Sequence, residues 1–301
     1  MFSRRHPFLF FCIIMAAMAT AGLFMLTIMV SAIDGGEEQY SGEKVGVIEI
    51  AGPMTDSRTI LHQIKNFRES DAIKAIVVRI DSPGGSVGPA QEIFREIRKT
   101  VPDKKVIASM GAVAASGGYY VAAGADGIMA NPGTITGSIG VIMGYTNFEE
   151  LLRKIGLSPV VIKSGEYKDI GSPVRPMTSD ERRLLESITK KIHRQFVDAI
   201  VEGRRLERAK VEVIADGRIL TGQEAHAQGL VDRLGNFEDA VQWAGELGGI
   251  KGEIETVFPE KEKFSLLRYL MESTLQLISK APLQSQAVPE VMMRVNAGGA
   301  K

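Results

Sequence analysis

Short runs rich in valine and isoleucine alternate with helical segments in the first part of the chain, and this alternation restricts the fold more than any other feature. The runs Val45 to Ile50, Ala75 to Ile80 and Lys105 to Met110 read as strands followed by turns. Between them, residues 60–67 and 90–99 carry apolar side chains at spacings of three and four, which predicts helices. Because strands that alternate with helices pair in parallel, the sequence predicts a layered α/β domain.

Further elements are predicted downstream. A long helix begins at Thr178, because Thr178 and Glu181 have the spacing of a capping box and apolar residues from Leu184 to Ile200 fall on one face. Residues 217–235 predict a strand, a short capped helix and a glycine-ended turn. The other predicted elements are strands over Gly127 to Ala130, Gly140 to Met143 and Pro159 to Ile162, and a helix over Phe148 to Ile155.

The N-terminal segment is long and apolar. Residues 7–33 contain no charged side chain, and Arg4, Arg5 and His6 come immediately before them. The run exceeds the roughly 20 residues that cross a bilayer, and it is longer than the h-region of a cleaved signal peptide, about 7 to 15 residues. We therefore expect an uncleaved anchor rather than a signal peptide. Basic residues ahead of a span predict a cytoplasmic N-terminus.

Composition excludes several kinds of partner and site. Lys+Arg and Asp+Glu are equal at 36 each, so no basic surplus indicates nucleic acid. The single cysteine, Cys12, excludes an intramolecular disulfide and a metal site built on several thiolates. We expect four parts: a cytoplasmic stub and anchor over 1–33, a linker over 34–44, the main domain over 45–258, and an amphipathic helix with a mobile tail over 259–301.

One serine stands out. The segment G-A-V-A-A-S-G-G-Y-Y, residues 111–120, places Ser116 among alanine and glycine where a strand turns into a helix. Its small neighbours let other backbone approach closely, and the hydroxyl of such a turn can point out of the fold. The adjacent Gly117 amide lies where a developing oxyanion would need a donor. The alternative is a packing turn in which Ser116 only caps a helix.

A second glycine turn follows the predicted strand Ala75 to Ile80. Its sequence, D-S-P-G-G-S-V over residues 81–87, puts two glycines ahead of a helix, where their amides can face a bound carbonyl group. A phosphate-binding loop is the main rival use of such glycines. The lysine and Ser/Thr of that motif are missing here, and so is G-x-G-x-x-G.

A nucleophilic serine needs a base within hydrogen-bond reach. The four histidines are His6, His62, His193 and His226. None accompanies a glycine-rich turn near Ser116, which disfavours a Ser-His-Asp triad. Lysine remains, because burial can leave its amine neutral. Lys168, in the loop S-G-E-Y-K-D-I-G-S-P, is the candidate, and Ser138 in T-I-T-G-S-I-G could orient its amine; a surface lysine and a turn-forming serine are the alternatives.

Four blocks, in this order, closely resemble the SppA type of signal peptide peptidase, a serine peptidase family within the ClpP/crotonase superfamily. The likeness runs from about residue 45 to residue 247. It implies a ClpP/crotonase-like α/β fold of repeated β-β-α layers with one N-terminal transmembrane helix, and a peptidase domain over 45–258. The blocks are D-S-P-G-G-S at 81–86, A-S-G-G-Y-Y at 115–120, T-G-S-I-G at 136–140 and G-E-Y-K at 165–168.

The resemblance also implies roles for individual residues. With one catalytic block, the chain is similar to the short form of the family, whose members build dome-like rings in which neighbouring subunits complete the sites. No cofactor, metal or nucleic acid is implied. The implied site is Ser116 as nucleophile, Lys168 as general base, Ser138 as the hydroxyl that orients the lysine, and Gly117 with Gly85 or Gly84 as oxyanion donors, Gly85 being preferred by guess.

The activity implied is that of a membrane-anchored serine endopeptidase that degrades cleaved signal peptides or similar short apolar peptides through an acyl-enzyme. The implied location is the bacterial inner membrane, with a single span and the catalytic domain on the extracytoplasmic side. The alternatives are a stomatin-partner protease, a crotonase-like acyl-CoA enzyme and an inactive membrane scaffold. The anchor and the pair Ser116 and Lys168 argue against the acyl-CoA enzyme.

Overall fold

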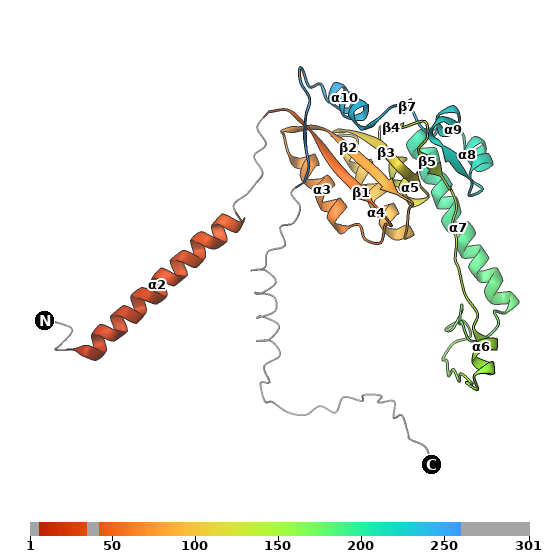
Figure 1. Cartoon of the computed structure of the whole chain (residues 1–301), viewed down its shortest axis with the longest axis horizontal. Helices are drawn as coiled ribbons and strands as arrows, with labels where there is room; N and C mark the ends of the chain where they lie inside the picture. The colour runs from red at the N-terminus through yellow and green to blue at the C-terminus, as the bar shows by residue number, and fades with distance from the viewer. Residues whose placement is uncertain (1–5, 35–41, 260–301) are drawn as a thin grey trace, which may run out of the picture. The chain divides into compact units, whose positions relative to one another are not determined.

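The computed structural model describes residues 6–34 and 42–259 (Figure 1). Most of the predicted linker, and nearly all of the predicted C-terminal helix and tail over 259–301, lie outside these residues. The apolar segment forms helix α2 (Pro7–Asp34). Within it, Pro7–Met25 has a mean hydropathy of 2.3, so α2 is long and apolar enough to cross a membrane.

The main domain is built on one sheet of eight strands. The order is β6-β5-β3-β2-β1-β8, with β4 paired to β3 and to β7. Every pairing is parallel except that of β5 with β6. The strands are β1 (Lys44–Ala51), β2 (Ile73–Ser82), β3 (Lys105–Ala115), β4 (Gly127–Ala130), β5 (Ile135–Gly137), β6 (Ile219–Thr221), β7 (Arg233–Leu234) and β8 (Glu255–Val257).

Helices cover both faces of the sheet. Alternate residues of β1 and β2 divide between two apolar clusters, because successive side chains of a strand point to opposite faces. Ile48 and Val78 join the larger cluster, with residues of α3, α4, α5 and α7, while Val47 and Val77 pack on α10. The helices are α3 (Arg58–Glu69), α4 (Val87–Thr100), α5 (Gly117–Ala122), α6 (Glu149–Lys154), α7 (Ser179–Arg204), α8 (Arg208–Ile214), α9 (Gly222–Ala227) and α10 (Phe237–Gly248).

Helix α7 packs on the domain through its second half only. There the Phe196 ring lies 4.8 Å from the Tyr120 ring of α5, and Gln195 accepts a hydrogen bond from Gln91 of α4. Its first turn has the predicted capping box of Thr178 and Glu181. Between that turn and Phe196 the helix rises about 25 Å, at ~1.5 Å per residue.

Residues 141–178, which we call the extension, lie along the first half of α7. They contain α6, which Figure 1 shows beside the N-terminal end of α7 and away from the sheet. The extension folds on itself and on α7: the Phe148 amide donates to the Pro173 carbonyl, and the Arg175 side chain pairs with Glu181. Its loop is therefore held at the end of α7 that is remote from α5.

Two predicted strands are wrong. Neither Gly140 to Met143 nor Pro159 to Ile162 forms a strand, and the short strand β5 comes earlier, at Ile135–Gly137. A strand needs a hydrogen-bonding neighbour, and these runs lie off the sheet. Their side chains are open to solvent: Ile142 is 95% exposed and Ile162 is 97% exposed.

The contact of α7 with α5 can be tested at a glycine. A Cβ built on Gly203 would lie 1.8 Å from the carbonyl oxygen of Ala123, so a methyl group cannot enter without moving the helix. We expect Gly203→Ala to lower the free energy of unfolding by about 1–3 kcal/mol and the melting temperature by several degrees. The control is Gly88→Ala in α4, where nothing lies within 4 Å of the added atom. Equal melting temperatures for the two variants would contradict the close approach.

Candidate active site

Ser116 occupies a strained turn between β3 and α5. Its backbone angles are φ 53° and ψ −118°, in a region that residues other than glycine rarely adopt. A non-glycine residue there costs on the order of 1–3 kcal/mol, and such residues cluster at active sites. Nucleophilic serines on sharp turns from strand to helix have this arrangement, because it lifts the hydroxyl out of the fold. The residue is partly exposed, while Gly117 beside it is buried.

The glycine loop after β2 lies directly against this turn. A Cβ built on Gly84 would lie 2.5 Å from the amide nitrogen of Gly117 and 3.0 Å from the Cβ of Ser116. One built on Gly117 would lie 3.3 Å from the amide nitrogen of Gly85. Gly84 also has a φ of 96°, which favours glycine. The two glycine segments therefore meet, backbone to backbone, at Ser116.

Hydrogen bonding distinguishes the two glycines of this loop. The Gly84 amide donates to the Ser82 hydroxyl at 3.1 Å, and the Gly84 carbonyl accepts from the Met54 amide at 2.8 Å. The amides of Gly85 and Gly117 have no acceptor among the hydrogen bonds of the described residues. Two unused donors beside a serine hydroxyl are the arrangement of an oxyanion hole. The geometry thus supplies a physical reason to prefer Gly85 over Gly84.

Ser138 lies next to Ser116 through strand pairing. The Ser116 amide donates to the Gly137 carbonyl at 2.9 Å, and Ala115 pairs with Gly137 in the parallel register of β3 and β5. Ser138 follows Gly137 with a φ of 50°, and its amide donates to the Arg218 carbonyl at 2.7 Å. Both serines therefore sit at the ends of neighbouring strands in left-handed backbone. The structure brings Ser138 to the turn of Ser116.

Lys168 is not at this site within one chain. It is an exposed residue of the extension, in the loop that Arg175 ties to the first turn of α7. Ser116 instead lies one helical turn from Tyr120, which packs on Phe196, about 25 Å further along α7 at ~1.5 Å per residue. The chain by itself thus joins Ser116, Ser138 and the glycine amides, and holds Lys168 at a different place.

Ion pairs surround the loop of Lys168, and the sequence analysis did not predict them. Asp169 pairs with Lys163 at 2.6 Å and with Arg175 at 2.8 Å, and Arg175 also pairs with Glu181. The hydrogen bonds from Arg175 and Lys163 hold the pKa of the Asp169 carboxyl far below its ordinary value. Hydrogen bonds from Arg175 and from the backbone at Thr178 lower the pKa of Glu181 to about 2. No recognised motif has this spacing on a loop.

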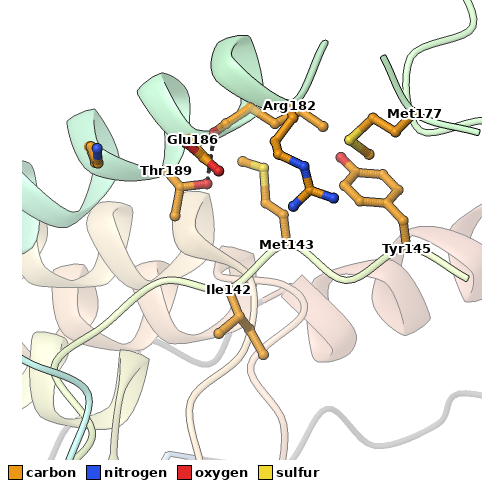
Figure 2. A pocket seen from close by; sticks show the side chains of 9 residues that line it. Ile142, Met143, Tyr145, Met177, Arg182, Glu186 and Thr189 are labelled. Carbon is orange, nitrogen blue, oxygen red and sulfur yellow. Dashed lines mark hydrogen bonds between the residues drawn. The ribbon is translucent and has the colours of Figure 1, made fainter. Parts of the chain in front are cut away.

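A groove of about 510 Å³ lies between the start of the extension and α7 (Figure 2). Figure 2 shows Met143 and Tyr145 on one side and Arg182 on the facing helix. The groove contains none of the predicted site residues, and its helix side is the half of α7 before Phe196. Its lining is Ile142, Met143, Tyr145, Met177, Arg182, Leu185, Glu186, Thr189 and Lys190.

Two protein-family models match the chain. The model of peptidase family S49 matches residues 98–251, and the model of the Clp protease family matches residues 44–136. The first covers about half of the chain and includes Ser116, Ser138 and Lys168. The second includes the glycine loop. The predicted ClpP-like α/β fold is confirmed by the second match and by the sheet described above.

Relatives of known sequence agree with these matches. A protein of Synechocystis sp., provisionally named a protease, is 44% identical over 244 residues, which are 79% of this chain and 87% of that protein. The chloroplastic serine protease SPPA of Arabidopsis thaliana is 35% identical over 227 residues, 72% of this chain and 34% of that one. Among solved structures, a mutant of a membrane-bound stomatin-specific protease matches 74% of this chain and 100% of its own, with a TM-score of 0.49 and 19% identity.

Proposed function

Since this chain belongs to peptidase family S49 and is a serine peptidase, we propose that it cleaves peptide bonds with Ser116 as nucleophile and Lys168 as general base. The observation that carries the proposal is the strained turn of Ser116 against the unused amides of Gly85 and Gly117. The peptidase family match favours hydrolysis over the acyl-CoA chemistry that the same fold also supports.

The proposed reaction has two stages. The neutral Lys168 amine takes the Ser116 proton as the hydroxyl oxygen bonds to the substrate carbonyl carbon. The amides of Gly85 and Gly117 stabilise the resulting oxyanion. When the tetrahedral intermediate collapses, the C–N bond breaks and the leaving amine takes the proton from the lysine ammonium. Water, deprotonated by the Lys168 amine, then attacks the acyl carbon, the bond to the Ser116 oxygen breaks, and the lysine ammonium returns the proton to that oxygen. The Ser138 hydroxyl keeps the amine directed at Ser116.

An adjacent copy of the chain supplies Lys168 in this proposal. Two observations support it: the length of α7 between the loop of Lys168 and Phe196, and the exposed apolar side chains of the extension, such as Ile142, Val160 and Ile162. Exposed apolar surface of this kind marks an interaction site. A head-to-tail contact repeated around a closed ring gives every Ser116 a lysine from its neighbour. The lysine then gains the dry surroundings that keep its amine neutral.

The substrates we propose are short apolar peptides, including cleaved signal peptides. The apolar helix α2 supports this, because it would hold the enzyme at a bilayer where such peptides are left. The basic residues ahead of α2 support a single span with the peptidase domain on the extracytoplasmic side of a bacterial inner membrane. A relative from Enterococcus faecium, provisionally named a signal peptide peptidase, supports the same class of substrate.

Covalent labelling tests the nucleophile. The full-length protein in detergent micelles is treated with a fluorophosphonate, and the modified peptide is identified by mass spectrometry. We expect phosphonylation of Ser116, none in Ser116→Ala, and much slower labelling in Lys168→Met, because the base activates the hydroxyl. The matched control is Ser172→Ala in the extension, which should label like the wild type. Labelling that persists unchanged in Ser116→Ala would show that another residue is the nucleophile.

A further inference from the structure

We propose that Arg175 is a positioning residue for catalysis, whose guanidinium fixes the loop of Lys168 to the first turn of α7. The inference rests on the proposed role of Lys168 as general base. Arg175 does not touch the reacting atoms in this proposal. It acts through Asp169, which directly follows Lys168 in the chain.

The guanidinium of Arg175 binds two separate segments at once. Toward the loop, its Nε donates to the Asp169 carboxylate at 2.8 Å and its Nη2 donates to the Asp169 carbonyl at 3.2 Å. Toward the helix, Nη1 donates to the Glu181 carboxylate at 2.9 Å, and Nη2 donates to the other oxygen of the same carboxylate. It holds both the side chain and the backbone of the residue next to Lys168, so the loop cannot turn without breaking several bonds.

The charged groups of this network are largely enclosed. The Glu181 side chain is only 4% exposed, and Asp169 and Arg175 are 14% and 26% exposed. Glu181 is fixed independently, because its carboxylate also accepts from the Thr178 amide at 2.9 Å in the capping box of α7. The N-terminal end of α7 is therefore a rigid support for the loop. Lys168 itself is exposed, free to be covered by a neighbouring molecule.

The other bonds of the loop are local and do not reach the helix. The Lys168 amide donates to Gly165, and the Ile170 amide donates to Tyr167. Lys163 bonds to the Glu166 carbonyl at 2.8 Å and to Asp169, inside the same loop. Among the described residues, the hydrogen bonds that join residues 163–170 to α7 all run through Arg175.

Only arginine has the geometry for this task. Its planar fork presents donors in several directions, whereas a lysine ammonium is a compact point charge that cannot span two carboxylates in the same way.

The charged groups around the loop are Lys163, Glu166 and Asp169, with Glu181 facing it from α7. The low pKa values of Asp169 and Glu181 keep both carboxylates ionised wherever a lysine amine can become neutral.

The test is the kinetics of Arg175→Gln in the full-length protein in micelles, with a short apolar peptide as substrate. We normalise kcat to the sites that a fluorophosphonate titrates, so that unfolded molecules do not count. We expect kcat to fall about 10- to 100-fold, as for misplacement of a catalytic group by about 1 Å, with KM within about threefold.

Two further variants sharpen the test. Arg175→Lys keeps the charge but lacks the fork, and we expect it to stay impaired. Arg183→Gln removes an exposed ion pair with Asp180 on the same turn of α7, without touching the loop, and should resemble the wild type. A kcat for Arg175→Gln within about twofold of wild type overturns the proposal, and so does full activity in Arg175→Lys. A raised KM with an unchanged kcat also overturns it, because the base would then be correctly placed.

Lys168→Met separates this inference from the proposed function. An inactive Lys168→Met together with an unaffected Arg175→Gln refutes only the role of Arg175. An active Lys168→Met refutes the assignment of the base itself, whatever Arg175→Gln does.

Discussion

Lys168→Met is expected to lower kcat for a short apolar peptide by at least about a thousandfold. Methionine keeps much of the length and apolar stem of lysine, but it cannot accept the Ser116 proton. The measurement is peptide hydrolysis by the full-length protein in micelles, with melting temperature as a check on folding. The control is Lys154→Met at the end of α6, an exposed lysine of the same extension, which should retain activity. Activity of Lys168→Met within tenfold of wild type would assign the base to another group.

A mixture of two inactive variants tests where the lysine comes from. Each proposed site takes Ser116 from one chain and Lys168 from the next, so rings assembled from equal amounts of Ser116→Ala and Lys168→Met contain sites with both groups intact. Random mixing around a heterologous ring predicts about a quarter of wild-type activity. Mixing Ser116→Ala with the double variant that carries both Ser116→Ala and Lys168→Met should give no activity. Mass spectrometry shows whether the rings contain both chains. If mixed rings have no peptidase activity, each chain completes its own site.

Gly84→Ala is expected to lower kcat by about a hundred- to a thousandfold, the effect of losing an oxyanion donor. The added methyl group would lie 2.5 Å from the Gly117 amide nitrogen, so the turn of Ser116 must move. The displacement separates the amides of Gly85 and Gly117, so they no longer donate to the same oxyanion. Peptide hydrolysis and the rate of fluorophosphonate labelling should fall together.

The matched control is Gly52→Ala. Gly52 also has a positive φ, of 70°, but nothing lies within 4 Å of the added atom. It thus carries the backbone strain of Gly84→Ala without the contact. We expect kcat to fall sharply in Gly84→Ala and to stay near the wild-type value in Gly52→Ala. Equal losses of kcat would show that strain, and not the approach to Gly117, causes the effect.

Local patterns in the sequence were enough to predict the centre of the fold. The apolar runs inside β1, β2 and β3, and the capping box of Thr178 and Glu181, depend on neighbours in the chain, which a sequence displays. The runs at Gly140 to Met143 and Pro159 to Ile162 have a similar composition. They are not strands, because strand formation also requires a partner strand, and periodicity does not reveal one.

The candidate site was also predictable only where it depends on residues that are close in the sequence. The small residues around Ser116 predict a tight turn, and the structure has one. The choice of Gly85 over Gly84 needed the bond from the Gly84 amide to Ser82, a contact that no motif encodes. The pairing of Arg175 with Asp169 and Glu181 was missed because it forms only after the loop folds against the helix. The site role of Lys168 remains a prediction, since in the proposed ring it depends on contacts outside a single chain.

If neighbours provide the base, the half of α7 before Phe196 keeps a single chain inactive. A newly inserted chain then carries its two reactive groups on opposite ends of a rigid spacer, so it is harmless to the other polypeptides of the membrane until it meets further copies. Proteolysis becomes a steep function of the number of chains per unit area of bilayer. A lower density of chains in a growing membrane would inactivate the enzyme without any inhibitor.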